Sequence, residues 1–322
     1  MINRVPVKFR NKAGLNLFGI LHRPQISREN GITIILLSPG VKMRVGPHNL
    51  YIKMTKLFLD MGFSVLRFDF FGLGDSEGEL EEDMLADVYN HIEVGRYVDD
   101  TIISMDWLEK NYGFNRFILG GLCGGAITAL LAASRDNRVV GILSLGMTSV
   151  LASFAADPAK YITQGQLKRL RDGYLRKLLK PKSWIRLLTL QSDYWIILKS
   201  TVQPLFKRIK VMLKLNRNEK TTTIITAKSI QDNSNPLFAS AFFRCMERNI
   251  PILLIFSGAD RLYWEFEEKF MQPRKDELDR IEKKYFSIHI VDKANHVFSF
   301  KEWQDEMLGV SKQWLTNIQI TS

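Results

Sequence analysis

The sequence predicts an α/β fold in which a mostly parallel sheet is covered by helices on both faces. Short apolar runs alternate along the chain with stretches in which apolar residues recur at helical spacing. Several of these runs lack polar alternation, which is typical of strands buried on both faces. The length of 322 residues, with 46% hydrophobic and 25% charged residues, supports a globular protein and excludes disorder, collagen-like repeats and coiled coils.

The expected elements begin with an antiparallel hairpin, in which residues 5–9 and 15–21 flank a turn at 11–14. The remaining strands are expected at 32–37, 63–68, 117–119, 139–145, 251–256 and 286–291. The helices are expected at 50–61, 94–112, 126–133 and 301–318. Gly120 and Gly121 are expected to end the strand that they follow.

The alternation of strands and helices stops at residues 151–248, a mainly helical stretch with no obvious buried strand. The net charge of +11 is concentrated there. Residues 158–220 hold 16 Lys or Arg and 3 Asp or Glu, so they carry +13 and leave −2 on the rest of the chain. The sequence therefore predicts a nearly neutral α/β core, residues 1–150 and 249–322, and a basic helical insertion, residues 151–248.

Cys123 lies at the centre of the pentapeptide GLCGG, between a predicted strand and a predicted helix. Glycines two residues before and after a nucleophile are typical of a sharp strand-to-helix turn, where neighbouring backbone passes too close for side chains. At a helix N-terminus the backbone N–H groups and the helix dipole stabilise a thiolate. Cys123 is therefore a candidate nucleophile. The alternative is a small buried cysteine in a glycine-rich turn.

Two further reactive side chains follow late strands. Asp260 ends the segment SGAD, where it either orients a catalytic imidazole or caps a helix that begins at residue 261. His296 lies in the segment ANHVFS, where it is either a general base for Cys123 or a polar surface residue. The carboxyl ends of parallel strands form one edge of a sheet, so the positions of Cys123, Asp260 and His296 favour one shared site.

Two loops that follow early strands belong at the same expected edge. The segment SPGV is expected to place the backbone N–H of Val41 opposite that of Gly124, and two such donors form an oxyanion hole. The glycine-rich loop at 67–78 is expected to be a structural turn, in which Asp69 and Ser76 bond to the backbone. No metal-ligand spacing, phosphate loop or dinucleotide motif is present, so we expect neither a metal nor a cofactor.

The motifs FDFFGLGDSEG, GLCGG, SGAD and ANHVFS together resemble the α/β-hydrolase superfamily in their order and spacing. The resemblance covers the whole chain except the basic insertion. It implies an eight-stranded, mostly parallel sheet with an inserted helical lid. It also implies that Cys123 is the nucleophile, His296 the base and Asp260 its acid partner, with Val41 and Gly124 as oxyanion donors.

Most relatives have serine where this chain has Cys123. Cysteine there resembles dienelactone hydrolases and bile-acid acyltransferase-type enzymes, and the segment RVGPH with the other motifs resembles hydrolases associated with exosortase systems. The resemblance implies a hydrolase acting on an ester, thioester or lactone through an acyl-enzyme intermediate, since a thiolate attacks such small acyl substrates readily. The alternatives are an acyltransferase that uses the same thioester, and a non-catalytic protein of this fold that binds a membrane or a partner.

The basic insertion allows three interpretations. It is a lid whose charges are solvated, a segment that contacts an anionic membrane or a lipid-like substrate, or a docking surface for an acidic partner such as a carrier protein. Nucleic acid is disfavoured because no nucleic-acid-binding fold accompanies the charge. With two cysteines and no visible signal peptide or membrane-length apolar run, a cytoplasmic protein is expected, either free or peripheral at the inner membrane surface.

Overall fold

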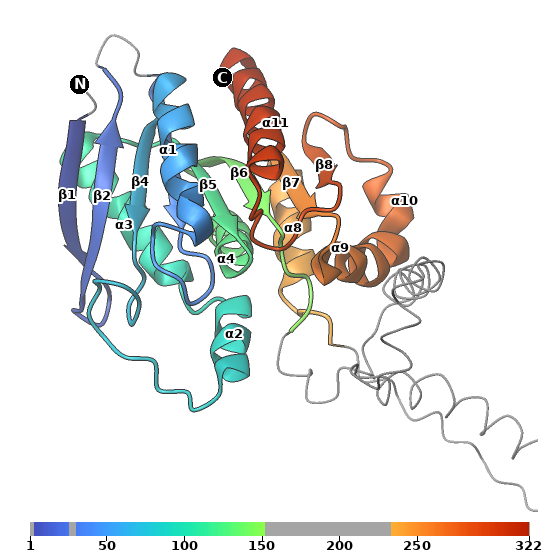
Figure 1. Ribbon diagram of the computed structural model, residues 1–322, viewed down its shortest axis with the longest axis horizontal. Coiled ribbons are helices and arrows are strands. Elements are labelled where there is room, and N and C mark those ends of the chain that lie inside the picture. Colours follow the sequence, from blue (N-terminus) through green and yellow to red (C-terminus); the bar gives the residue numbers. More distant parts are fainter. Residues whose placement is uncertain (1–2, 26–29, 152–232, 322) are drawn as a thin grey trace, which may run out of the picture. The chain divides into compact units, whose positions relative to one another are not determined.

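The computed structural model describes residues 3–25, 30–151 and 233–321 (Figure 1). The chain divides into two compact units, one made of residues 1–155 and 233–322 and the other of residues 156–232. Every described residue belongs to the first unit. Most of the expected insertion, including its basic stretch, therefore lies outside the described residues.

Eight strands of the first unit form one sheet in the order β1-β2-β4-β3-β5-β6-β7-β8. Their bounds are β1 Asn3–Arg10, β2 Asn16–Arg23, β3 Thr33–Leu37, β4 Ser64–Phe68, β5 Phe117–Leu122, β6 Val139–Leu145, β7 Ile252–Ser257 and β8 Phe286–Val291. β1 and β2 pair antiparallel as the expected hairpin, β2 also pairs antiparallel with β4, and the other neighbours are parallel. The predicted eight-stranded, mostly parallel sheet is confirmed.

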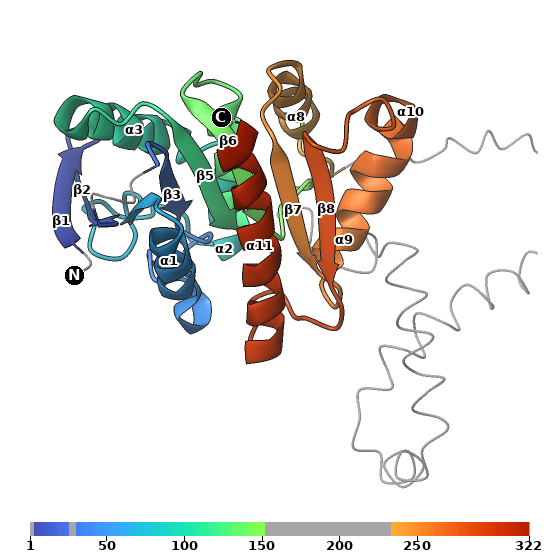
Figure 2. The same cartoon turned by 90° about the horizontal axis from the view of Figure 1, so that it is seen from above.

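Helices cover both faces of this sheet (Figure 2). They are α1 Leu50–Asp60, α2 Leu85–Glu93, α3 Val98–Tyr112, α4 Gly124–Ala133, α8 Phe238–Glu247, α9 Arg261–Phe266, α10 Lys275–Leu278 and α11 Lys301–Thr321. Buried side chains of α1 and α11 pack in one core, and those of α3, α4 and α8 pack in a second core on the other face. In the part of the chain that the structure describes, no helix has the length and hydrophobicity needed to cross a bilayer.

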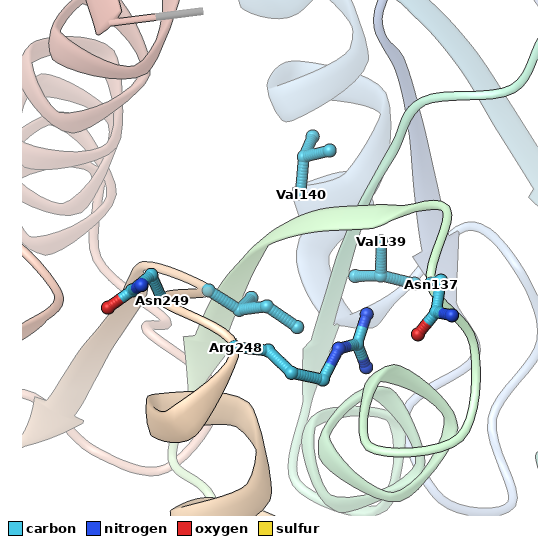
Figure 3. A pocket seen from close by; sticks show the side chains of 6 residues that line it. Asn137, Val139, Val140, Arg248 and Asn249 are labelled. Atoms are coloured by element: carbon cyan, nitrogen blue, oxygen red, sulfur yellow. The ribbon is translucent and has the colours of Figure 1, made fainter.

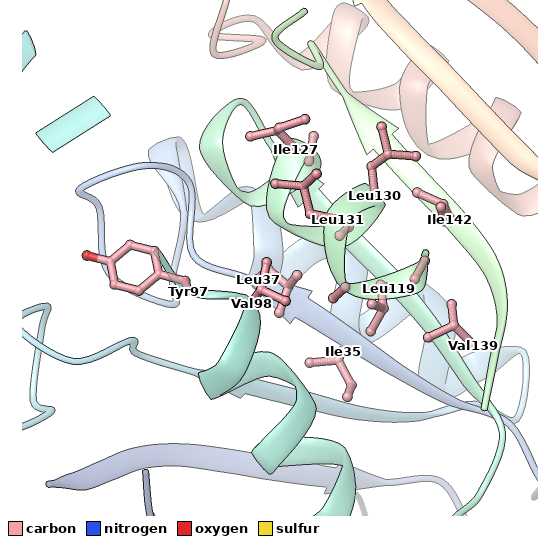
Figure 4. Packing of buried hydrophobic residues seen from close by; sticks show 14 of the residues in the cluster. Ile35, Leu37, Tyr97, Val98, Leu119, Ile127, Leu130, Leu131, Val139 and Ile142 are labelled. Carbon is pink, nitrogen blue, oxygen red and sulfur yellow. The ribbon is translucent and has the colours of Figure 1, made fainter. Parts of the chain in front are cut away.

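The central strands are buried on both faces because successive side chains point to opposite cores. On β3, Ile35 and Leu37 belong to the core beneath α3, α4 and α8, whereas Ile34 and Leu36 belong to the core beneath α1 and α11. Figure 4 shows the first of these cores, with Leu130 of α4 among the side chains that cover the sheet. This two-sided burial explains why the strand sequences show no polar alternation.

Two expected boundaries are wrong along this part of the chain. β5 runs through Gly120 and Gly121, which pair with β3 on one side and β6 on the other. Backbone hydrogen bonds to two neighbours outweigh the low strand propensity of glycine at this central position. The helix expected at 94–112 begins only at Val98, because the chain turns at Gly95 with a φ of 105°, and the separate helix α2 precedes it.

The helix α8 lies in the range expected for the insertion, yet it packs in the core of the first unit. The rings of Phe238 and Phe242 lie 4.8 Å and 5.0 Å from the ring of Phe270. The expected end of the insertion at residue 248 is therefore corrected, since the first unit resumes at residue 233. The core of the first unit returns with the helix α8, which buries one apolar stripe, and the buried strand β7 follows it.

Phe242→Ala is expected to lower the free energy of unfolding by about 3–5 kcal/mol, because it leaves a cavity in a fully buried aromatic cluster. Phe243→Ala changes the neighbouring, only partly buried ring of the same helix and is expected to have a much smaller effect. Urea unfolding of both full-length variants measures the difference. Equal losses would contradict the placement of α8 in the core.

Candidate active site

Cys123 occupies a sharp turn between the end of β5 and the start of α4. Its backbone has φ 55° and ψ −115°, a conformation that strains a residue other than glycine by about 1–3 kcal/mol. The turn is held on both sides: the Cys123 N–H donates to the carbonyl of Leu145 at 2.9 Å, and the Cys123 carbonyl accepts from the N–H of Ala126 at 2.9 Å. The thiol is partly exposed at the carboxyl edge of the sheet.

The glycines around Cys123 are required by close backbone contacts, as the pentapeptide predicts. A Cβ on Gly121 would lie 2.4 Å from the carbonyl carbon of Gly125, and a Cβ on Gly125 would lie 2.4 Å from the carbonyl oxygen of Leu37. No side chain tolerates such distances. The turn therefore packs directly, backbone against backbone, on the end of β3.

Asp260 and His296 come together from the loops that follow β7 and β8. The Nδ1 atom of His296 lies 2.5 Å from Oδ2 of Asp260. The loops are also joined by a hydrogen bond from the N–H of Ala259 to the carbonyl of Ala294 at 2.9 Å. Asp260 occupies the N-cap position of α9 but makes no side-chain capping bond. The helix-cap interpretation of Asp260 is therefore wrong, and its carboxylate contacts the imidazole of His296 instead.

The Cys123 thiol also influences the protonation of the His296 imidazole. Burial opposes protonation of the imidazole, but the hydrogen bonds and negative charges of Asp260 and Cys123 outweigh it and raise the pKa of His296 to about 10. Because Asp260 engages Nδ1, the ring nitrogen that remains for the thiol is Nε2. Asp260 and His296 thus form a hydrogen-bonded pair, and both Asp260 and the Cys123 thiol favour the protonated imidazole.

The loop between β3 and α1 brings Val41 next to the start of α4. A Cβ on Gly124 would lie 2.9 Å from the Cα atom of Gly40, the residue before Val41. Gly124 is the first residue of α4, so its N–H has no acceptor within the helix. Within the described residues no protein acceptor is found for the Val41 N–H either. The two segments from which the sequence predicts an oxyanion hole are therefore in direct contact.

A buried ion pair fixes this loop to the turn after β4. The carboxylate of Asp69, which is fully buried, accepts from the backbone N–H of Arg44 at 2.6 Å and pairs with the Arg44 guanidinium. Ser76 donates to the carbonyl of Asp69 at 2.6 Å. The prediction that loop 67–78 is a structural turn stabilised by Asp69 and Ser76 is confirmed, and Arg44 is an additional partner that the sequence did not indicate.

Two tyrosines near this site were not identified from the sequence. The ring of Tyr89 lies over Gly40, where a Cβ would be 2.7 Å from Cε1, and burial together with the charges of Cys123 and Glu93 raises the pKa of Tyr89. Tyr51 is fully buried on α1. The sequence held a signal for Tyr51, because a tyrosine beside the predicted apolar stripe of a helix needs a partner for its hydroxyl.

A pocket of about 410 Å³ lies at the opposite, amino-terminal edge of β6 and β7 (Figure 3). It is lined by Asn137, Val139, Val140, Arg248, Asn249 and Ile250. None of the predicted site residues lines it. The Arg248 guanidinium donates to the carbonyl oxygens of Ala133 and Asp136 at 2.6 Å and 2.9 Å, so its role there is structural. Among the described residues, no group of three His, Cys, Asp or Glu could hold a metal ion.

No protein-family model and no curated protein matches the chain. Solved structures match it along almost its whole length. An esterase from Pyrococcus furiosus is 16% identical, with 98% of this chain and 91% of the esterase covered and a TM-score of 0.57. A putative α/β hydrolase from Agrobacterium tumefaciens is also 16% identical, with 97% and 95% covered and a TM-score of 0.52. A lidless α/β serine hydrolase from Xanthomonas campestris is 12% identical, with 98% and 94% covered and a TM-score of 0.51.

At these low sequence identities, the structural similarity shows the fold of the chain and does not show which reaction it catalyses. The fold of the matched structures agrees with the eight-stranded, mostly parallel sheet. These observations together show that the chain has the α/β-hydrolase fold.

Proposed function

We propose that the protein hydrolyses a small ester, thioester or lactone with Cys123 as nucleophile, His296 as general base and Asp260 as the partner of the imidazole. The observation that carries this proposal is the hydrogen bond between Asp260 and His296, together with the influence of the Cys123 thiol on the His296 pKa. The fold shared with an esterase supports an ester as substrate. The direct contact between the Val41 loop and Gly124 supports an oxyanion hole beside the thiol.

In the first half of the reaction, Nε2 of His296 takes the proton of the Cys123 thiol. The thiolate sulfur then bonds to the acyl carbon, and the carbonyl oxygen becomes an oxyanion that accepts hydrogen bonds from the N–H groups of Val41 and Gly124. When the intermediate collapses, the bond to the leaving alcohol or thiol breaks and the leaving group takes the proton from His296. An acyl thioester on Cys123 remains.

In the second half, water attacks the thioester carbon and gives a proton to His296. Collapse of this second intermediate breaks the carbon–sulfur bond, releases the acid and regenerates the thiolate and imidazolium pair. A thiolate leaves more readily than an amine, so amides are poor substrates for such a site. If an alcohol or amine attacks the same thioester in place of water, the acyl group is transferred to that acceptor and the protein acts as an acyltransferase.

Acylation of Cys123 tests the proposal directly. Full-length protein incubated with p-nitrophenyl acetate is expected to gain one acetyl group on Cys123, located by mass spectrometry after rapid acid quenching. Cys245 is the internal control, since burial raises the pKa of this second thiol to about 12 and it is expected to stay unlabelled. Cys123→Ala is expected to abolish labelling and turnover. A folded protein without an adduct on Cys123 would refute the mechanism.

The pH dependence of acylation tests the role of Asp260. The wild-type rate is expected to fall at alkaline pH near the His296 pKa of about 10, where the imidazolium loses its proton. Asp260→Asn removes a group that raises this pKa, so the alkaline limb is expected to move to lower pH. Glu306→Gln removes the same charge from a surface pair, 2.8 Å from His289, and is the matched control. An unchanged limb in Asp260→Asn would argue against the assigned pairing.

The charge of residues 158–220 supports a second proposal, in which the protein contacts an anionic membrane surface. Each Lys or Arg near such a surface contributes about 1 kcal/mol of attraction, which salt screens. Full-length protein is expected to co-sediment with phosphatidylserine vesicles at low salt and to be released at high salt, with little binding to phosphatidylcholine. Equal binding to both lipids would contradict the proposal. Unchanged binding by Cys123→Ala is expected, because membrane contact does not need the thiol.

A further inference from the structure

Tyr51 joins the two backbone segments that carry the candidate oxyanion donors. Its hydroxyl donates to the carbonyl oxygen of Leu37 at 2.8 Å and accepts from the N–H of Leu122 at 2.7 Å. Leu37 is the last residue of β3, and Leu122 is the last residue of β5, directly before Cys123. One side chain thus bonds both strands at the point where each one ends.

The position of this hydroxyl follows from the separation of the two strands. Their parallel ladder ends with Leu37 opposite Gly121, because β3 leaves the sheet toward Val41 while β5 turns sharply at Cys123. Beyond that pair, the carbonyl of Leu37 and the N–H of Leu122 no longer meet. Both are buried, and an unpaired buried backbone group costs about 1–3 kcal/mol. The Tyr51 hydroxyl occupies the gap and satisfies both groups.

Tyr51 also holds the far end of the loop that carries Val41. Its backbone N–H donates to the carbonyl of Val45 at 3.2 Å. A Cβ on Gly46 would lie 3.1 Å from the Tyr51 ring. Tyr51 therefore contacts the chain on both sides of Val41. It bonds to Leu37 before Val41, and it contacts Val45 and Gly46 after it. Burial raises the pKa of Tyr51, so the hydroxyl keeps its proton and remains both donor and acceptor.

We propose that Tyr51 is a positioning residue, which sets the separation between the backbone N–H of Val41 and that of Gly124 in the oxyanion hole. This inference rests on the proposed acyl-transfer chemistry at Cys123. Donors must lie within about 0.5 Å of their productive positions. The hydrogen bonds of the Tyr51 hydroxyl go to Leu37 and Leu122 and not to the thiol, so we expect it to act mainly on the steps that form an oxyanion.

Two reactions of the same thiol separate these effects in the full-length protein. Acylation by p-nitrophenyl acetate forms an oxyanion, whereas alkylation by iodoacetamide displaces iodide at a saturated carbon and forms none. Tyr51→Phe keeps the ring and removes the hydroxyl. Its acylation rate constant is expected to fall about 10- to 100-fold. Its alkylation rate is expected to stay within about twofold of the wild type, because the hydrogen bond between His296 and Asp260 is intact.

Thr55→Val is the matched control. Thr55 is a buried residue of the same helix, and its hydroxyl donates to the carbonyl of Tyr51 at 2.6 Å without reaching either strand. This variant is expected to acylate within about twofold of the wild-type rate. Acylation of Tyr51→Phe at the wild-type rate would overturn the inference. Equal losses of acylation and alkylation in Tyr51→Phe, or a similar loss of acylation in Thr55→Val, would overturn it as well.

A measurement on the wild-type protein keeps the inference testable if Tyr51→Phe does not fold. The Leu122 amide is expected to exchange with solvent as slowly as its neighbours in β5, because the Tyr51 hydroxyl accepts from it. Fast exchange of this amide would contradict the hydrogen bond from Leu122 to the Tyr51 hydroxyl.

Complete absence of Cys123 acylation in the wild type would refute the proposed function. Normal wild-type acylation with an unaffected Tyr51→Phe would refute only the role of Tyr51.

Discussion

The positive φ angle at Cys123 is the constraint on which the rest of the site depends. A strained cysteine is held there only if α4 starts directly against the end of β3, and this requires glycine at positions 121 and 125. The same close approach has a second effect. It puts the unpaired N–H at the start of α4 beside the loop that carries Val41. One backbone geometry therefore exposes the nucleophile and assembles the groups proposed to bind its oxyanion.

The side chains around this turn hold it from three directions. Asp69 and Arg44 anchor the loop after β3, Tyr51 joins the ends of β3 and β5, and Asp260 is hydrogen-bonded to His296. The acidic groups near the thiol favour a protonated imidazole. These charges are local to the carboxyl edge of the sheet, and the +13 of residues 158–220 lies elsewhere in the chain. The excess positive charge of the sequence therefore bears on the proposed membrane contact.

The fold and the proposed catalytic side chains could be predicted because each leaves a local signature in the sequence. Apolar runs mark the strands, glycines at fixed offsets mark the turn at Cys123, and Asp260 and His296 each follow a strand. The role of Asp260 needed the structure, since a carboxylate before a helix has the same pattern whether it caps the helix or orients an imidazole. The structure shows its contact with Nδ1 of His296 and no capping bond, which supports the proposed role beside the imidazole.

Other parts of the site depend on contacts between distant segments, which no local pattern reports. Tyr51 bonds Leu122 across 71 positions, and Arg44 pairs with Asp69 across 25. The insertion ends earlier than the sequence predicts for a related reason. The core resumes with α8, whose apolar stripe is recognisable only once α4 and Phe270 are seen to cover it.

A crystal structure of the protein trapped with a slowly hydrolysed ester would test the central claim most directly. It is expected to show an acyl carbon bonded to Sγ of Cys123, with the carbonyl oxygen within hydrogen-bond distance of the N–H groups of Val41 and Gly124. An acyl group on another residue, or a carbonyl oxygen directed away from both N–H groups, would contradict the proposed mechanism.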